Sequence, residues 1–164
     1  QGYNAIRKQN YNLAISYMIK AKELNPTDHE VYKHLGYSYY IQGNHSQAFS
    51  TYEKGIKILK VKIKKNKKDP LLYLESARLN ILMWEIDNFT GIRYNERQAL
   101  KNFNKSLNLD YNKDVLCEYG KFNIKIDQEQ LGEISGWTIE HLKESAGLGS
   151  EECQELCRKY NFFW

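Results

Sequence analysis

The sequence predicts an all-α protein in which antiparallel helix pairs stack one after another. Apolar residues recur at helical spacing over most of the 164 residues. Matching small and large residues recur 34 positions apart, a period typical of stacked helix pairs. The chain has only two prolines, and both fall where one predicted helix ends and another begins.

Length and composition indicate about one folded domain. Residues are 41% hydrophobic and 27% charged, which argues against a disordered chain. Apolar runs stay shorter than the roughly 18 residues of a membrane span, and the sequence shows no secretory signal. The first residue is Gln1 rather than Met, so we expect a processed chain or an excised fragment, located in the cytoplasm.

The first strong helix is predicted over residues 10–24. Its small and large residues precede their counterparts by 34 positions: Ala14 and Ala48, Met18 and Tyr52, Ala21 and Gly55. Gly2 precedes Gly36 by the same interval, so residues 1–25 look like a repeat without its first few residues. Asn25-Pro26 ends the helix because a residue before proline avoids the α region. Thr27 and Asp28 then supply an N-cap for the next helix.

Residues 29–62 form the most regular unit of the chain. In its first helix one face carries Tyr32, Leu35, Gly36 and Tyr39. Gly43 interrupts the pattern, and a second helix carries Ala48, Tyr52 and Gly55. Large residues thus stand where a helix pair needs filling, and small ones where two helices touch.

This arrangement resembles the tetratricopeptide repeat, whose signature is also 34 residues long. The resemblance covers about residues 1–125 and implies a right-handed superhelical solenoid, with repeats near 1–28, 29–69 and 70–112 and a partial one at 113–126. It also implies a concave groove lined by the first helix of each pair.

Two departures from the regular repeat follow the central unit. Lys54–Lys68 contains eight lysines and no acid, interleaved with apolar residues, which predicts a long amphipathic helix. Asp69 and Pro70 begin the next helix, predicted over residues 70–86, and turn residues predict a loop over Asn88–Gln98. Ala99 follows Ala48 by 51 residues, 17 more than one repeat, and we place these extra residues in the lysine-rich helix and the loop.

The C-terminal part is predicted to be an acidic helical cap over residues 127–164. Residues 1–126 hold 21 basic and 12 acidic side chains, whereas residues 127–164 hold 3 and 8. Helices are expected at 114–126, 128–133, 137–145 and 151–160, the last capped by Ser150. Stacked repeats need such a cap over their last apolar face. The terminal residues 162–164 either fold back onto this core or meet a segment beyond the sequence.

By its resemblance the chain is expected to be a non-catalytic scaffold or adaptor that binds a peptide or helix of another protein in the groove. The groove positions that the resemblance implies are Lys33, His34, Tyr37 and Tyr40 in the second repeat, Leu74, Glu75, Arg78 and Ile81 in the third, and Glu118 and Lys121 in the fourth. Phe89, Arg93 and Tyr94 in the predicted loop either anchor an interface or fill a gap between helix pairs.

The C-terminal tail of a heat-shock chaperone is an improbable ligand. The family's carboxylate clamp needs basic and amide side chains where this chain has Tyr3, His34, Leu71 and Glu75. An acid at the third-repeat position would repel a carboxylate.

Other functions are less well supported by the residues. The lysine-rich helix would suit an anionic surface or nucleic acid, although a solvated helix face or a dock for the acidic C-terminal segment explains it as well. A targeting module of a larger enzyme is a further alternative. The histidines show no metal-ligand spacing, and we expect no cofactor or catalytic residue. Cys117, Cys153 and Cys157 are predicted to be small buried hydrophobes without a disulfide framework.

Overall fold

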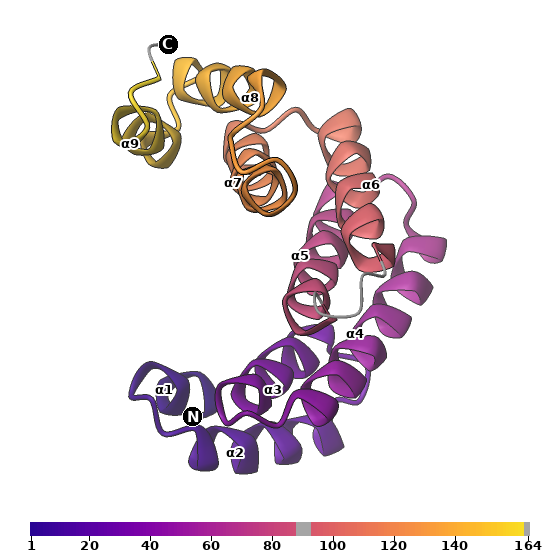
Figure 1. Cartoon of the computed structure of the whole chain (residues 1–164). Coiled ribbons are helices and arrows are strands. Elements are labelled where there is room, and N and C mark those ends of the chain that lie inside the picture. The colour runs from indigo at the N-terminus through magenta and orange to yellow at the C-terminus, as the bar shows by residue number, and fades with distance from the viewer. Residues whose placement is uncertain (88–92, 163–164) are drawn as a thin grey trace. The chain divides into compact units, whose positions relative to one another are not determined.

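The computed structural model describes residues 1–87 and 93–162, and within these ranges it contains nine helices and no strand (Figure 1). The chain divides into two compact units, Gln1–Ala99 and Leu100–Trp164. The all-α prediction is confirmed. Within the described ranges no helix is long and apolar enough to cross a membrane.

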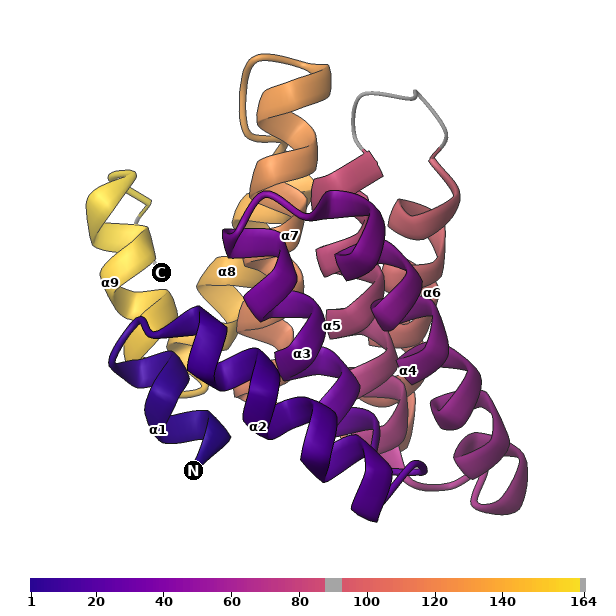
Figure 2. The same cartoon turned by 90° about the horizontal axis from the view of Figure 1, so that it is seen from below.

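The first unit is a succession of packed helices. They are α1 (Gly2–Arg7), α2 (Tyr11–Leu24), α3 (His29–Ile41), α4 (His45–Lys65), α5 (Pro70–Asp87) and the beginning of α6 (Tyr94–Leu109). From α1 to α5 each helix packs against the next, as Figures 1 and 2 show. The predicted antiparallel pairs are therefore present, and α4 has the predicted lysine-rich extension.

Side-chain caps set the helix starts where the sequence placed them. The Asn10 side chain accepts a hydrogen bond from Leu13 N, 3.2 Å away, at the start of α2. Asp28 accepts from Glu30 N at 3.0 Å, and Asp69 from Leu71 N at 3.0 Å. Each carboxylate or amide oxygen satisfies a backbone donor that the first helical turn leaves unpaired.

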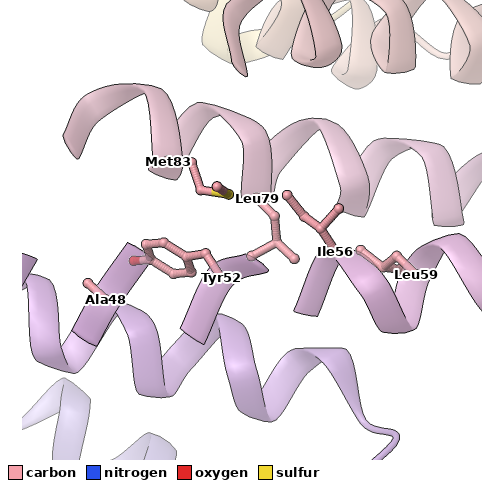
Figure 3. Close-up of a cluster of buried hydrophobic side chains, with 6 residues drawn as sticks. All are labelled: Ala48, Tyr52, Ile56, Leu59, Leu79 and Met83. Carbon is pink, nitrogen blue, oxygen red and sulfur yellow. The ribbon is translucent and has the colours of Figure 1, made fainter. Parts of the chain in front are cut away.

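The core between α3, α4 and α5 explains the spacing of small and large residues. Its main cluster consists of Ala48, Tyr52, Ile56, Leu59, Leu79 and Met83 (Figure 3). Gly36 lies so close to Tyr52 that a Cβ atom there would be 2.4 Å from the ring carbon Cε1. A Cβ at Gly55 would lie 3.0 Å from Leu79 Cδ1. The glycines thus let the backbones approach two large buried side chains.

The second unit contains the rest of α6, then α7 (Lys113–Gln130), α8 (Gly136–Gly147) and α9 (Glu151–Lys159). Asn112, Ser135 and Ser150 accept hydrogen bonds from the first turns of the last three helices. Buried side chains of α7, α8 and α9 form its core: Cys117, Ile124, Leu142, Ala146, Cys153 and Cys157. Phe162 packs against this core, whereas Phe163 and Trp164 lie outside the described residues.

Two predicted boundaries are wrong. Helix α6 begins at Tyr94, so residues 94–98 of the predicted loop are helical. The turn residues at the start of this segment predicted a loop, but Glu96 stands in the first turn of α6, where the helix dipole favours an acid. The separate helix predicted at 128–133 is absent among the described residues, because α7 continues through Gln130.

The cysteine prediction also needs correction. Cys117 of α7 and Cys153 of α9 form a disulfide, with their Cα atoms 5.7 Å apart and a sequence separation of 36. Cys157 is a free thiol buried in the same core. All three are buried as predicted, but the pairing depends on how α7 and α9 pack, which the spacing of the cysteines does not reveal.

Candidate partner-binding surface

A network of charged side chains joins α3 to α5. The ammonium nitrogen of Lys33 lies 2.8 Å from Glu30 Oε1 and 2.6 Å from Glu75 Oε2. Arg78 donates to the other oxygen of Glu75. The Lys33 and Glu75 side chains are only 17% and 16% exposed, so water screens their attraction less than that of a surface pair. The network therefore fixes the spacing of two neighbouring first helices.

The protonation states follow from these contacts. A hydrogen bond with His34, followed by one with Lys33, holds the pKa of Glu30 well below its ordinary value despite partial burial. Burial opposes the charge on Lys33, but its hydrogen bonds with Glu30 and Glu75 and their attraction raise its pKa overall. Burial, with the nearby Lys62 ammonium, lowers the pKa of His29. The network is thus two carboxylates and two cations, with His29, whose lowered pKa favours the neutral ring, beside them.

One part of this network has the composition of a metal site. Ligand atoms of His29, Glu30 and Glu75 all lie within 4.8 Å of one another. However, the Lys33 ammonium contacts both carboxylates, so the chain itself supplies the cation. We assign no metal to these residues.

Acid should weaken the first unit through Glu30. Its pKa in the folded protein is lowered from the ordinary value of 4.5, so the stabilisation is complete above that pH and is lost as the pH falls below it. We expect urea midpoints to decline between pH 5 and 3 (about the range of carboxyl titration) and the decline to be smaller in Glu30→Gln. Equal declines in both proteins would contradict this role. Glu53→Gln, which changes an exposed acid of α4, is the matched control.

Aromatic rings flank the charged network. The Tyr3 ring meets His34 edge-on with centroids 4.6 Å apart, and Tyr11 meets Tyr37 at 6.4 Å. Tyr40 meets His45 at 5.4 Å. Tyr37 and Tyr40 are half-buried, whereas Tyr3 is 48% exposed. These rings can offer apolar area and hydroxyl groups to a bound chain.

The structure brings together only some of the predicted site residues. Lys33, His34, Glu75 and Arg78 share the network described above, with Tyr37 and Tyr40 farther along α3. Leu74 is 5% exposed and belongs to the core, and Ile81 is half-buried. Leu71, at the start of α5, is 64% exposed.

The remaining predicted residues stand elsewhere. Glu118 and Lys121 belong to α7 in the second unit, where Lys121 pairs with Glu152 of α9 at 2.7 Å. Arg93 and Tyr94 are exposed at the start of α6, and Phe89 lies outside the described residues.

Sequence reasoning missed Glu85 on α5. It stands seven residues after Arg78, and positions seven apart share a helix face. This spacing is the sequence signal that could have placed Glu85 on the same helix face as Arg78. Its carboxylate is close enough to contribute to the raised pKa of Tyr37, after burial and the neighbouring Tyr11.

These features define a helical-repeat protein with a polar and aromatic face on its first helices. The tetratricopeptide-repeat family model matches residues 1–28 and 29–58 of the chain, in agreement with the resemblance seen in the sequence. Repeats of this family serve generally as non-catalytic scaffolds for protein–protein interaction. No curated protein matches the chain.

One solved structure has a similar fold, and two others match less closely. A crystal structure of MamA matches with a TM-score of 0.51 at 15% identity, covering 90% of this chain and 74% of that one. MamA 41-end from Desulfovibrio magneticus RS-1 matches with a TM-score of 0.40 at 14% identity, covering 90% of each chain. A crystal structure of the APC/C hetero-tetramer Cut9–Hcn1 matches with a TM-score of 0.32 at 15% identity, covering 96% of this chain and 41% of that one.

Proposed function

We propose that this protein is a non-catalytic adaptor that holds a peptide or helix of another protein against α3 and α5. The contact surface, here called the groove face, comprises Tyr3, His34, Tyr37, Tyr40, Leu71, Arg78 and Ile81. The observation that carries the proposal is the fixed network of Glu30, Lys33 and Glu75 beneath it. This network holds the two helices in place before a partner arrives, which reduces the ordering cost of binding.

The chemistry of the groove face suits a partner with apolar anchors. Tyrosine and arginine are over-represented among residues that dominate binding energies, and Leu71 adds exposed apolar area. An extended peptide or an amphipathic helix would place its anchors between these side chains. A chaperone tail is not proposed, because the Glu75 carboxylate occupies the face and already accepts from Lys33 and Arg78. The proposal includes no cofactor and no catalytic group.

Simultaneous replacement of Tyr37, Tyr40 and Arg78 by alanine should abolish partner capture. Truncation of one such anchor costs about 2 kcal/mol or more, so three should weaken binding by several orders of magnitude. The measurement is quantitative capture from cell extract, with circular dichroism to verify helical content. The matched control replaces Gln47, Ser50 and Glu53 by alanine, all exposed on α4. Undiminished capture by a folded groove variant would refute the proposal.

A second candidate function is supported by the lysine side chains of α4 and the turn after it. Lys54, Lys57, Lys60, Lys64, Lys65, Lys67 and Lys68 are all exposed, and in the described part of the chain none of them pairs with a carboxylate. Lys62 differs, because its nitrogen lies 3.0 Å from His29 Nδ1. Seven unpaired ammonium groups would attract an anionic surface or a nucleic-acid backbone.

Retention on heparin should therefore depend steeply on salt. Changing Lys57, Lys60, Lys64 and Lys65 to glutamine should lower the salt concentration needed for elution, because fewer counterions are released on binding. Heparin at low ionic strength is the probe. Failure of the unmodified protein to bind there would dismiss this second function without affecting the groove.

A further inference from the structure

We propose that one edge of the first unit rests on an anionic lipid bilayer. This edge, here called the basic edge, carries the exposed lysines at the end of α4 and in the turn after it, together with two exposed apolar residues. Its residues are Leu24, Lys60, Val61, Lys64, Lys65, Lys67 and Lys68. The proposal deepens the second candidate function, on which it rests, by naming a bilayer as the anionic surface. It does not involve the groove face, to which Leu71 belongs.

The alternating direction of the helices brings these residues to one edge. Helices α2 and α4 end, and α3 and α5 begin, on the same side of the first unit, along the lower edge of Figure 2. The Lys62 ammonium lies 3.0 Å from His29 Nδ1 at the start of α3. The Tyr73 hydroxyl of α5 donates to the Lys67 carbonyl oxygen at 3.2 Å. The end of α4 and the turn after it are therefore held against both neighbouring helices.

The basic edge carries an excess of positive charge. Among the described residues none of its five lysines pairs with a carboxylate. Lys64 and Lys65 stand in the last turn of α4, where they also offset the negative helix end, but the other three lie outside that turn. The acids at these turns are Glu23, which is exposed, and the helix caps Asp28 and Asp69. Five lysines against three acids leave a surface that attracts anions.

The apolar residues of the basic edge favour a bilayer over a nucleic acid. Leu24 is 88% exposed and Val61 is 54% exposed. Single exposed apolar residues are common, so what matters here is that these two lie beside the lysines. On a bilayer, lysine ammonium groups reach the headgroups while neighbouring apolar side chains enter the acyl boundary. A nucleic-acid backbone would use only the charges, and residues 61–71 include no aromatic ring on which bases could stack.

Charge and apolar area would act together in this contact. Each lysine near an anionic membrane strengthens binding about fivefold. An apolar side chain that enters the acyl boundary strengthens it by about a further tenfold. The α2–α3 and α4–α5 turns both lie on this edge, and a broad surface can contact both at once. The opposite edge, where α3 ends at Ile41, would face away from the bilayer.

Co-sedimentation with lipid vesicles tests the proposal. Vesicles of phosphatidylcholine alone are compared with vesicles of equal parts phosphatidylcholine and phosphatidylserine, and heparin serves as a water-soluble polyanion. We expect the protein to bind the anionic vesicles only. Leu24→Gln combined with Val61→Gln should weaken that binding at least about tenfold and leave heparin retention unchanged. Ile41→Gln, at a residue 44% exposed on the opposite edge, should bind like the parent protein.

A second pair of variants tests the charges. Lys64→Gln combined with Lys68→Gln should weaken vesicle binding by roughly 25-fold, since two lysines are lost, and should also reduce heparin retention. Lys101→Gln combined with Lys105→Gln, an exposed pair of the same spacing on α6, is the matched control and should change neither. Circular dichroism verifies that each variant is folded.

Equal binding of the Leu24 and Val61 variant and the parent to anionic vesicles would overturn the proposal, because charge alone would then explain the contact. Heparin retention without vesicle binding would also overturn it and would favour a nucleic acid, while the second candidate function would stand. Failure of the parent to bind either heparin or vesicles would refute both.

Discussion

Replacing Gly36 with alanine should destabilise the protein by about 1–3 kcal/mol, the usual cost of overpacking a core. The new Cβ would lie 2.4 Å from Tyr52 Cε1 and 2.6 Å from Cδ1. Tyr52 is fully buried between α3, α4 and α5, so its rigid ring cannot move aside without disturbing Leu79 and Met83. In an open helix the same change would stabilise by about 1 kcal/mol. A loss of stability would therefore show that the contact outweighs helix propensity.

Urea denaturation measures this effect, with Gly147→Ala as the matched control. Gly147 is also helical, but no atom lies within 4 Å of the Cβ that alanine would add. We expect the control to equal or slightly exceed the parent protein in stability. Gly36→Ala should lower the free energy of unfolding less in a Tyr52→Leu protein than in the parent, because the ring that the new Cβ would meet is absent. A Gly36→Ala protein as stable as its parent would contradict the packing described for this helix pair.

Reduction of the Cys117–Cys153 disulfide should cost the second unit up to about 4 kcal/mol, by the chain-entropy estimate for a loop of this size. The bond closes a 36-residue separation and joins α7 to α9. Once it is open, α9 is held by its apolar contacts with α7 and α8 and by polar contacts such as the Lys121–Glu152 pair. Hydrogen exchange of the α7–α9 amides with and without reductant tests this, and α3–α5 serve as the internal control because the described part of that unit contains no cysteine.

The variant Cys153→Ala should exchange like the reduced parent and show no response to reductant. Equal protection of α9 in the oxidised and reduced parent would exclude a stabilising disulfide. The same bond bears on location, because disulfides persist in oxidising compartments and are rare in the cytosol. A cytoplasmic location, proposed from the sequence, therefore predicts three alkylatable thiols when cells are lysed directly into denaturant, which exposes the buried cysteines. An oxidising compartment predicts one, from Cys157.

The fold was largely predictable because its signals are local. The recurrence of Gly36, Tyr52 and Gly55 reports on contacts inside one helix pair, and caps such as Asp28 mark helix starts within a few residues. The family match over residues 1–58 covers the stretch where those signals are most regular. The start of α6 was missed because a polar segment such as residues 94–98 is compatible with either a loop or an exposed helix.

The candidate site was less predictable because it depends on contacts between distant residues. Lys33 and Glu75 are 42 positions apart in sequence. Both were predicted to contact a partner, but in the structure their side chains pair with each other. Leu74 shares a helix with Leu71, yet the first is buried and the second exposed. The Cys117–Cys153 disulfide likewise joins residues that are distant in sequence. Each depends on the packing of whole helices, which the residue pattern of a single helix does not specify.

Site-specific photocrosslinking tests the central claim most directly. A photoreactive amino acid replaces either Leu71, which is exposed at the start of α5 on the groove face, or Lys57, which is exposed on α4. If the protein is an adaptor that binds its partner against α3 and α5, the probe at position 71 will crosslink to the co-purifying protein and the probe at position 57 will not. Crosslinking from position 57 with none from position 71 would contradict the account.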